Sequence, residues 1–230
     1  MINLSVIVPF FNEEKFLEES VERLIENNIY EKILLIDNNS TDNSNYIASK
    51  LAKDNINIEI HQTGSEKGKG VALSFAKQFV KTSHVIIHDA DLEYFPDDIV
   101  EMFELSKDNP DSLILGSRFI GRKERKNVYL RTSIANKVMS LFLSFVNFYY
   151  ISDVASCYKL MPSKFFINEN FKERGFSVEI EMLAKFLKFN RSVVEVPIKY
   201  QGRSYKEGKK IKAIDGFNYL ASTVKYSLFN

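Results

Sequence analysis

Three acids stand at alternate positions in the stretch HDADLEY, residues 88–94: Asp89, Asp91 and Glu93. An apolar run at 84–87 leads directly into them. Carboxylates spaced in this way converge on one hard cation if the backbone turns where the strand ends. Mg²⁺ or Mn²⁺ held by carboxylates usually keeps waters and shares its ligands with substrate phosphates. The alternative is a solvated acidic loop, or a cap for a helix near Pro96, and the short motif alone does not decide.

A second stretch whose residues could take part in chemistry is GSEKGKGVALSF, residues 64–75. In it Lys67 and Lys69 alternate with glycines before a helical pattern. Glycine permits close backbone approach, a helix start offers N–H donors, and lysine supplies positive charge. The spacing matches neither a Walker loop nor GxGxxG. An ordinary loop before a helix is the simpler interpretation, so this stretch predicts a phosphate contact only when it is taken together with other motifs.

Other candidates are single residues or charged runs. Asp37 follows an apolar run and can accept hydrogen bonds from a base or a ribose, although a helix cap is the plainer alternative. Residues 117–137 and 203–212 are both rich in Arg and Lys, which suits phosphate binding or a solvated surface. Cys157 is expected to be a small buried residue, and His61 and His88 are expected to be structural.

The elements that must position these groups alternate along the first half of the chain. Short, nearly uninterrupted apolar runs at 4–10, 32–37, 56–61, 84–89 and 112–117 predict strands covered on both faces. Helical patterns at 13–28, 45–54, 71–81 and 97–108 separate them. This alternation predicts an α/β fold with a doubly wound, mainly parallel sheet. Such sheets bind ligands beyond the carboxyl ends of their strands, where all the polar stretches above begin.

The second half is less regular. The apolar and aromatic run at 138–151 is too short to span a bilayer and predicts either a core helix or an interfacial one. A strand-like run at 195–200 precedes the second basic stretch and a final helical pattern. We therefore expect one domain over 1–230 with a C-terminal helical and basic extension.

Composition excludes several classes. A net charge of +1 gives no global field favouring nucleic acid, and a single cysteine among 230 residues excludes an internal disulfide framework. The N-terminus lacks the pattern of a signal peptide, and no apolar run is long enough for a spanning helix. A cytoplasmic location is the expectation, with no nucleic acid partner.

Eight stretches occur together in an order that resembles glycosyltransferase family two, most closely the dolichyl- and polyprenyl-phosphate sugar synthases. They are SVIVPFFNEE, LLIDNNSTDNS, KGKGVA, HDADLEYFPDDI, GSRF, DVASCYKLMP, GFSVEIEML and EVPIKYQGRSYKEGKKI. The resemblance covers about residues 4–217, and it implies that residues 1–120 form the nucleotide-sugar half of the domain and residues 121–230 the acceptor half. It implies a GT-A fold, a UDP- or GDP-linked sugar donor, a Mg²⁺ or Mn²⁺ cofactor and a role in envelope glycan biosynthesis.

The resemblance also implies roles for single residues. Phe11 stands where the family often has Tyr, Asn38 and Asn39 replace the common Asp-Gly, and Glu93 sits where a Gln often helps to hold the metal. The metal ligands implied are Asp89, Asp91 and Glu93. The donor-binding residues implied are Pro9, Phe11, Glu13, Asp37, Asn39, Lys69, Asp89, Ala90, Asp91, Arg118, Arg203 and Lys209.

Family members of this type invert the anomeric centre as a nucleoside diphosphate leaves, and Asp91 is the expected catalytic metal ligand. A hydroxyl acceptor, such as a glycan, requires a base, for which Glu181, Glu179 and Asp153 are candidates by position. A polyprenyl or dolichyl phosphate is already anionic, which the two basic stretches favour. A peripheral membrane contact follows if the 138–151 run lies on a bilayer.

Two rival classes remain. A nucleotidyltransferase would show a glycine-rich basic loop after its first strand, where this chain has PFFNEE. A non-enzymatic lipid- or polyanion-binding module would use the basic stretches, but it would have no need for three acids together.

Overall fold

The computed structural model describes residues 2–203 and 213–229, with the backbone alone for 213–217. Its strands are β1 (Leu4–Phe10), β2 (Lys32–Asp37), β3 (Ile58–Gln62), β4 (His84–Ile87), β5 (Leu113–Ser117), β6 (Arg125–Lys126), β7 (Lys159–Pro162), β8 (Val193–Pro197) and β9 (Tyr200–Gln201). Its helices are α1 (Leu17–Asn27), α2 (Ser44–Asp54), α3 (Lys69–Ala76), α4 (Asp97–Asp108), α5 (Leu130–Asn147), α6 (Ser163–Asn168), α7 (Val178–Phe189) and α8 (Ala213–Val224), with short turns at Lys77–Phe79 and Lys225–Phe229.

The main sheet has seven strands in the order β3-β2-β1-β4-β7-β5-β8. β1 pairs in parallel with both β2 and β4, and β2 pairs in parallel with β3. Ile33–Ile36 and Val85–Ile87 are fully buried, as apolar strands with helices on both faces must be. The predicted α/β fold with a mainly parallel sheet is therefore confirmed.

One strand departs from the parallel pattern. β7 lies between β4 and β5 and is antiparallel to both, so the fourth and fifth expected strands are not neighbours. The sequence gives little warning of this strand, since β7 is only four residues long and begins with a charged residue, Lys159. Its position brings residues 157–159 beside the carboxyl end of β4.

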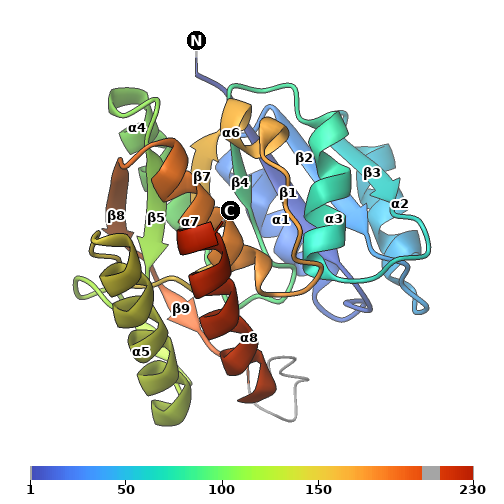
Figure 1. Cartoon of the computed structure of the whole chain (residues 1–230). Helices are drawn as coiled ribbons and strands as arrows, with labels where there is room; N and C mark the ends of the chain where they lie inside the picture. Colours follow the sequence, from blue (N-terminus) through green and yellow to red (C-terminus); the bar gives the residue numbers. More distant parts are fainter. Residues whose placement is uncertain (1, 204–212, 230) are drawn as a thin grey trace.

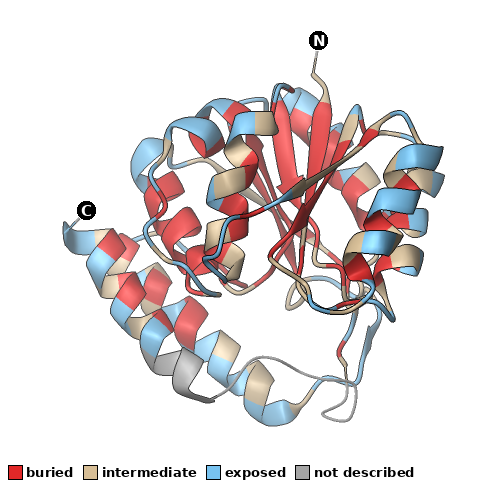
Figure 2. Cartoon of the chain, turned by 90° about the vertical axis from the view of Figure 1, so that its right-hand side faces the viewer, coloured by how far each residue is buried: buried red, intermediate tan, exposed pale blue. Residues whose placement is uncertain are grey.

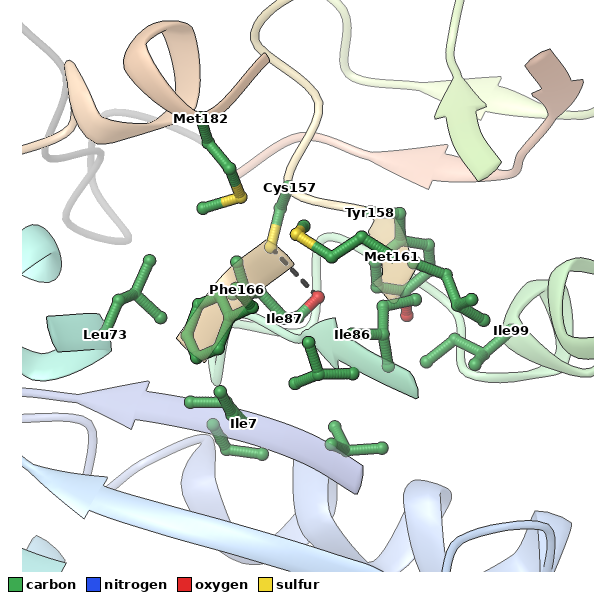
Figure 3. Packing of buried hydrophobic residues seen from close by; sticks show 14 of the residues in the cluster. Ile7, Leu73, Ile86, Ile87, Ile99, Cys157, Tyr158, Met161, Phe166 and Met182 are labelled. Atoms are coloured by element: carbon green, nitrogen blue, oxygen red, sulfur yellow. Dashed lines mark hydrogen bonds between the residues drawn. The ribbon is translucent and has the colours of Figure 1, made fainter. Parts of the chain in front are cut away.

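Helices cover both faces of the sheet. In Figure 1, α3, α6 and α7 lie in front of the strands, whereas α1 and α2 lie behind them. Buried residues fill the strands and the inner helix faces, and exposed residues mark the outer faces (Figure 2). Figure 3 shows part of this core, where Cys157 packs beside Met161, Phe166 and Met182, and its thiol lies 3.4 Å from the Ile87 carbonyl. Cys157 is buried, as expected.

α5 and α8 pack against each other and project beyond the ends of the strands (Figure 1). α5 starts at Leu130, eight residues before the apolar run that predicted it, and its two faces differ. Met139, Ser140 and Leu143 are buried, whereas Leu141 and Phe145 are mostly exposed. The run is therefore core on one side and exposed on the other. Among the described helices, none is long and apolar enough to cross a membrane.

Candidate active site

The strand ends surround one large cavity of about 710 Å³. Loops after β1, β2, β3, β4 and β5 all contribute to its wall, as the sheet topology predicted, and α5, α7, β9 and α8 close the other side. The predicted site residues in this wall are Pro9, Phe11, Glu13, Lys69, Asp89, Ala90, Asp91, Glu93, Arg118 and Arg203. Lys209 lies outside the described residues.

The backbone turns sharply directly after the two aspartates, because Leu92 adopts a left-handed conformation with φ 61°. Asp89 forms an ion pair with Lys69, with 2.6 Å between Oδ1 and Nζ. Burial opposes ionisation of Asp89, but the Lys69 ammonium outweighs it and lowers the pKa of this carboxyl. Asp89 is therefore a charged and already partnered acid.

Asp91 has a different environment. Burial, together with the neighbouring Glu93 and Asp89 carboxylates, raises the pKa of Asp91 to about 7, although Arg203 acts in the opposite direction. Arg203 Nη2 lies 2.8 Å from Asp91 Oδ2, and Arg203 Nη1 lies 3.4 Å from Glu13 Oε2. Burial is the largest cause of this raised pKa, and the two neighbouring carboxylates add to it.

Glu93 is held from two sides. The Tyr200 hydroxyl donates to Glu93 Oε2 at 2.7 Å, and the backbone N–H of Arg203 donates to Glu93 Oε1 at 2.7 Å. Both donors belong to the segment that begins with β9. This segment is thereby fastened to the acidic loop after β4.

The acids fit a divalent cation only in part. Within the described residues, no three acids, histidines or cysteines are already arranged around a metal position. An ion that travels with a diphosphate needs only one or two carboxylates from the protein, because phosphate and water oxygens complete its shell. Asp91 and Glu93, hard oxygen donors whose side chains are each 14% exposed, fit that smaller role.

Lys69 belongs to a buried chain of alternating charges. Its ammonium lies 2.6 Å from Asp89 and 2.8 Å from Glu179 Oε1, and Glu179 Oε2 lies 2.6 Å from Lys159. Lys159 is fully buried in β7. Glu179 lines the cavity from α7, and each of its two carboxylate oxygens lies within ion-pair distance of an ammonium group.

Asp153 lies behind the cavity wall and binds Arg118. Its two carboxylate oxygens accept from Arg118 Nε at 2.7 Å and from Nη2 at 2.8 Å, and its side chain is fully buried. Arg118 lines the cavity and Asp153 does not. The structure thus places this candidate base where it orients an arginine.

Glu181, expected as a candidate base, lies outside the cavity. It is fully buried on α7, accepts hydrogen bonds from the backbone N–H groups of Lys172 and Glu173, and pairs with Lys185. It is not part of the cavity wall. Its carboxylate ties the 172–173 segment to α7, so we do not retain it as a catalytic base.

Asp37 and Asn39 also lie outside the cavity wall. The Asp37 carboxylate accepts from the Ser40 N–H at 2.8 Å and from Asn45 Nδ2 at 2.8 Å. These bonds hold the loop before α2 but do not cap the helix, whose N-cap residue is Asn43. Asn39 has φ 64° and donates to Thr63 and Gly64. Asn38 takes the cavity position, and its Oδ1 accepts from the Gly68 N–H at 2.5 Å.

The glycines around Lys69 have a purpose that the sequence did not suggest. A Cβ on Gly68 or Gly70 would overlap the carbonyl oxygens of Arg174 or Glu173. The Gly70 N–H donates to the Arg174 carbonyl at 2.8 Å. These glycines therefore let the start of α3 dock on the 173–175 loop, which places Lys69 between Asp89 and Glu179.

Sequence reasoning missed part of the far wall. Arg131, Ala135 and Met139 of α5 face the cavity at helical spacing, and Asn136, Tyr200 and Phe176 join them. Arg131 belonged to the recognised basic stretch, but the sequence did not distinguish it from its neighbours. Arg131, Ala135 and the buried Met139 recur every four residues, and this helical spacing was the signal in the sequence that could have identified them.

The fold and the cavity together define a glycosyltransferase of the GT-A class, and the chain belongs to glycosyl transferase family 2, whose model matches residues 5–168. Among curated relatives, the UDP-N-acetylglucosamine–dolichyl-phosphate N-acetylglucosaminyltransferase of Methanococcus voltae is 25% identical and covers 92% of this chain and 91% of its own. A dolichol-phosphate mannosyltransferase of Saccharomyces cerevisiae is 27% identical and covers 90% of this chain and 81% of its own.

The same enzyme type from Pyrococcus furiosus is 28% identical over 95% of this chain, which spans 62% of that relative. Among solved structures, glucosyl-3-phosphoglycerate synthase of Mycobacterium tuberculosis, in complex with Mn²⁺, UDP and glucosyl-3-phosphoglycerate, superposes with a TM-score of 0.76 at 14% identity. That match covers 98% of this chain and 80% of the other. It supports the fold.

Proposed function

We propose that this glycosyltransferase moves a sugar from a UDP- or GDP-linked donor to the phosphate of a polyprenyl or dolichyl lipid, with inversion at the anomeric carbon. The observation that carries the proposal is the state of the acids in the cavity. The lining carboxylates, Glu13, Asp89, Asp91, Glu93 and Glu179, each lie within ion-pair distance of a lysine or arginine.

Such an arrangement suits an acceptor that arrives as an anion. A hydroxyl acceptor must lose a proton to a base, and a base held by two cations is a poor one. A lipid phosphate needs positive charge instead. Arg118, oriented by Asp153, and Arg131 of α5 supply that charge from the cavity wall.

The donor is proposed to occupy the N-terminal half, between Phe11, Lys67 and the acids after β4. Lys67 Nζ lies 4.4 Å from the centre of the Phe11 ring, and both side chains line the cavity. Asp91 and Glu93, with Asp89 behind them, would hold a Mg²⁺ or Mn²⁺ ion that, when bound, neutralises the leaving diphosphate. Asp89 and Glu179 fix the Lys69 ammonium beside that region.

A peripheral membrane contact belongs to the same proposal. Exposed apolar side chains of α5, with Phe148 just beyond its end, recur at three- and four-residue spacing on one face: Leu130, Ile134, Val138, Leu141, Phe145 and Phe148. Arg131 lies on the same helix and in the cavity wall. An interfacial helix at that position would present a lipid phosphate to the cavity without extracting its chain from the bilayer. The relatives named for dolichyl-phosphate transfer support this assignment.

The test is a panel of UDP- and GDP-sugars offered with polyprenyl phosphates or with hydroxyl acceptors, with and without EDTA. We expect a labelled lipid product, with the anomeric configuration inverted, that chelation abolishes and Mn²⁺ or Mg²⁺ restores. Arg131→Gln should lower transfer to lipid phosphate, whereas Arg125→Gln, an exposed charge outside this cavity, should not. Efficient transfer to hydroxyls, with none to lipid phosphates, would overturn the acceptor assignment.

A further inference from the structure

We propose that the Arg203 guanidinium occupies the place of the divalent ion beside Asp91 and Glu93 before ligands bind. It leaves these carboxylates when the ion and the donor diphosphate enter. The inference rests on the proposed function and concerns regulation of that same site. It differs from a fixed phosphate contact, because the arginine would change partners during each catalytic cycle.

The position of Arg203 is the first evidence. Its guanidinium lies 2.8 Å from Asp91 and 3.4 Å from Glu13, and its Nε lies 3.9 Å from Glu93. These acids come from the loops after β1 and β4. Arg203 therefore lies among the carboxylates expected to face a metal, and it lines the cavity itself.

The quality of these contacts is the second. Arg203 uses separate nitrogens for separate acids, and its buried Nε–H has no hydrogen-bond acceptor among the residues that the structure describes. Arg118 provides the contrast within the same cavity, because it grips Asp153 through two short parallel hydrogen bonds. Bidentate pairs are the stronger arrangement, and an unsatisfied buried donor is costly. Of the two arginines, Arg203 is built for release.

The third argument is mutual exclusion. A carboxylate oxygen of Asp91 that accepts from a guanidinium is a poorer ligand for an ion, so ion binding favours departure of the arginine. The freed guanidinium then matches a diphosphate, which arrives with the ion and accepts its donors. The ion and the diphosphate should consequently bind more tightly together than separately. The ion displaces Arg203 from the carboxylates, and the diphosphate then accepts the hydrogen bonds of the freed guanidinium.

The experiment measures Mn²⁺ affinity by electron paramagnetic resonance on the full chain, without donor or acceptor. We expect Arg203→Gln to bind Mn²⁺ on the order of tenfold more tightly than the wild type. Lys67→Gln is the matched control: it removes one positive charge from the same cavity, but its ammonium lies over the Phe11 ring. The affinity of Lys67→Gln for Mn²⁺ should change by less than about twofold, because screening weakens the effect of a charge that lies over an aromatic ring and not against the acids.

A second measurement adds UDP or GDP. In the wild type the nucleotide should tighten Mn²⁺ binding, and in Arg203→Gln this coupling should shrink. Arg203→Lys, which keeps the charge but loses the fork, should fall between the two, and urea denaturation checks that every variant is folded.

The outcomes separate the two hypotheses. Equal Mn²⁺ affinity in the wild type and Arg203→Gln, or an equal gain in Lys67→Gln, would remove the exchange and leave the proposed function standing. Failure of every protein to bind Mn²⁺, with or without nucleotide, would overturn both the exchange and the metal-dependent part of the function.

Discussion

Asp91 and Glu181 are two acids of low solvent exposure, 14% for the Asp91 side chain and 0% for Glu181, and their surroundings assign them different roles. Asp91 lines the cavity among other carboxylates with a pKa near 7. Glu181 accepts from two backbone N–H groups and pairs with a lysine outside the cavity. Glu181 therefore stabilises the fold, whereas Asp91 is the acid that we propose as a metal ligand.

Replacement of Asp91 tests the first duty. Asp91→Asn keeps the size but removes the charge, so we expect transfer to fall at least about 100-fold, as for other groups that stabilise developing charge. The unfolding midpoint should hardly change, because the site loses repulsion as well as an ion pair. Asp97→Asn, a mostly exposed acid at the start of α4, is the control. Undiminished turnover of radiolabelled donor in Asp91→Asn would exclude it as the metal ligand.

Replacement of Glu181 tests the second. Glu181→Gln should lower the free energy of unfolding by about 3 kcal/mol, because it breaks a buried ion pair and weakens two backbone contacts. Urea denaturation measures the change, with the exposed Glu22→Gln as control. If instead activity vanished while stability stayed at the wild-type value, Glu181 would have to be reinstated as a base.

At the scale of elements, α3 and the 173–175 loop form one unit. Gly68 and Gly70 allow direct backbone contact, and Lys69 between them reaches both Asp89 and Glu179. Elements separated by a hundred residues therefore fix one ammonium group. The glycine motif works by packing, and the lysine that it carries performs the electrostatics.

Gly70→Ala should destabilise the protein by about 2 kcal/mol or more, because the new methyl group overlaps the Glu173 carbonyl and the backbone must shift. Gly64→Ala in the same loop is the matched control, since no atom of the described residues lies within 4 Å of its added Cβ. That variant should stay within about 0.5 kcal/mol of the wild type. Equal unfolding free energies for the two variants would contradict the packing role.

The exposed face of α5 makes a separate prediction. Leu141→Ser with Phe145→Ser should weaken sedimentation with anionic vesicles at least tenfold, because each apolar side chain contributes roughly 1.5 to 3 kcal/mol when fully buried. Tyr46→Ser with Ile56→Ser removes two exposed apolar side chains elsewhere and is the control. Equal loss in both double variants would argue against α5 as the contact.

Sequence patterns reached the elements unevenly, and for physical reasons. β1, β2, β4 and α4 were located nearly to the residue, because strands buried on both faces leave uninterrupted apolar runs and an amphipathic helix leaves a periodic one. β7 was not, since its Lys159 is charged and yet fully buried against Glu179. Such a partner lies far away in sequence and leaves no local trace.

The candidate site followed the same division. The acids after β4 and the arginine after β5 were predicted because strand ends of a parallel sheet converge. Asp37, Asn39 and Glu181 were placed in the site by family pattern, and the structure keeps them outside the cavity wall. Hydrogen bonds that saturate a carboxylate locally cannot be read from residue type.

At the scale of the whole molecule, one cavity joins both halves of the chain, since its wall runs from Pro9 to Tyr219. A ligand that bridges this wall should therefore stabilise the entire fold. With Mn²⁺ and the cognate nucleoside diphosphate at about 100 times their dissociation constants, we expect the melting temperature to rise by roughly 5 to 10 °C.

EDTA should cancel most of that rise, and the nucleoside without phosphates should produce little of it. Differential scanning fluorimetry measures all three conditions and also reveals whether UDP or GDP is preferred. An unchanged melting temperature with both nucleotides and Mn²⁺ would contradict the assignment of the cavity to a nucleotide-linked donor.

The insertion of β7 between β4 and β5 has a consequence for how the protein is made. The edge of β4 becomes paired only when Pro162 has been synthesised, 75 residues after Ile87 (162 − 87). At ordinary translation speeds this takes roughly 4 to 15 s. During that interval the nascent chain carries an apolar strand with an open hydrogen-bonding edge, the feature that promotes pairing between neighbouring chains. Slower synthesis of residues 88–162 should therefore lower the yield of correctly folded enzyme, even though the finished sheet hides that strand completely.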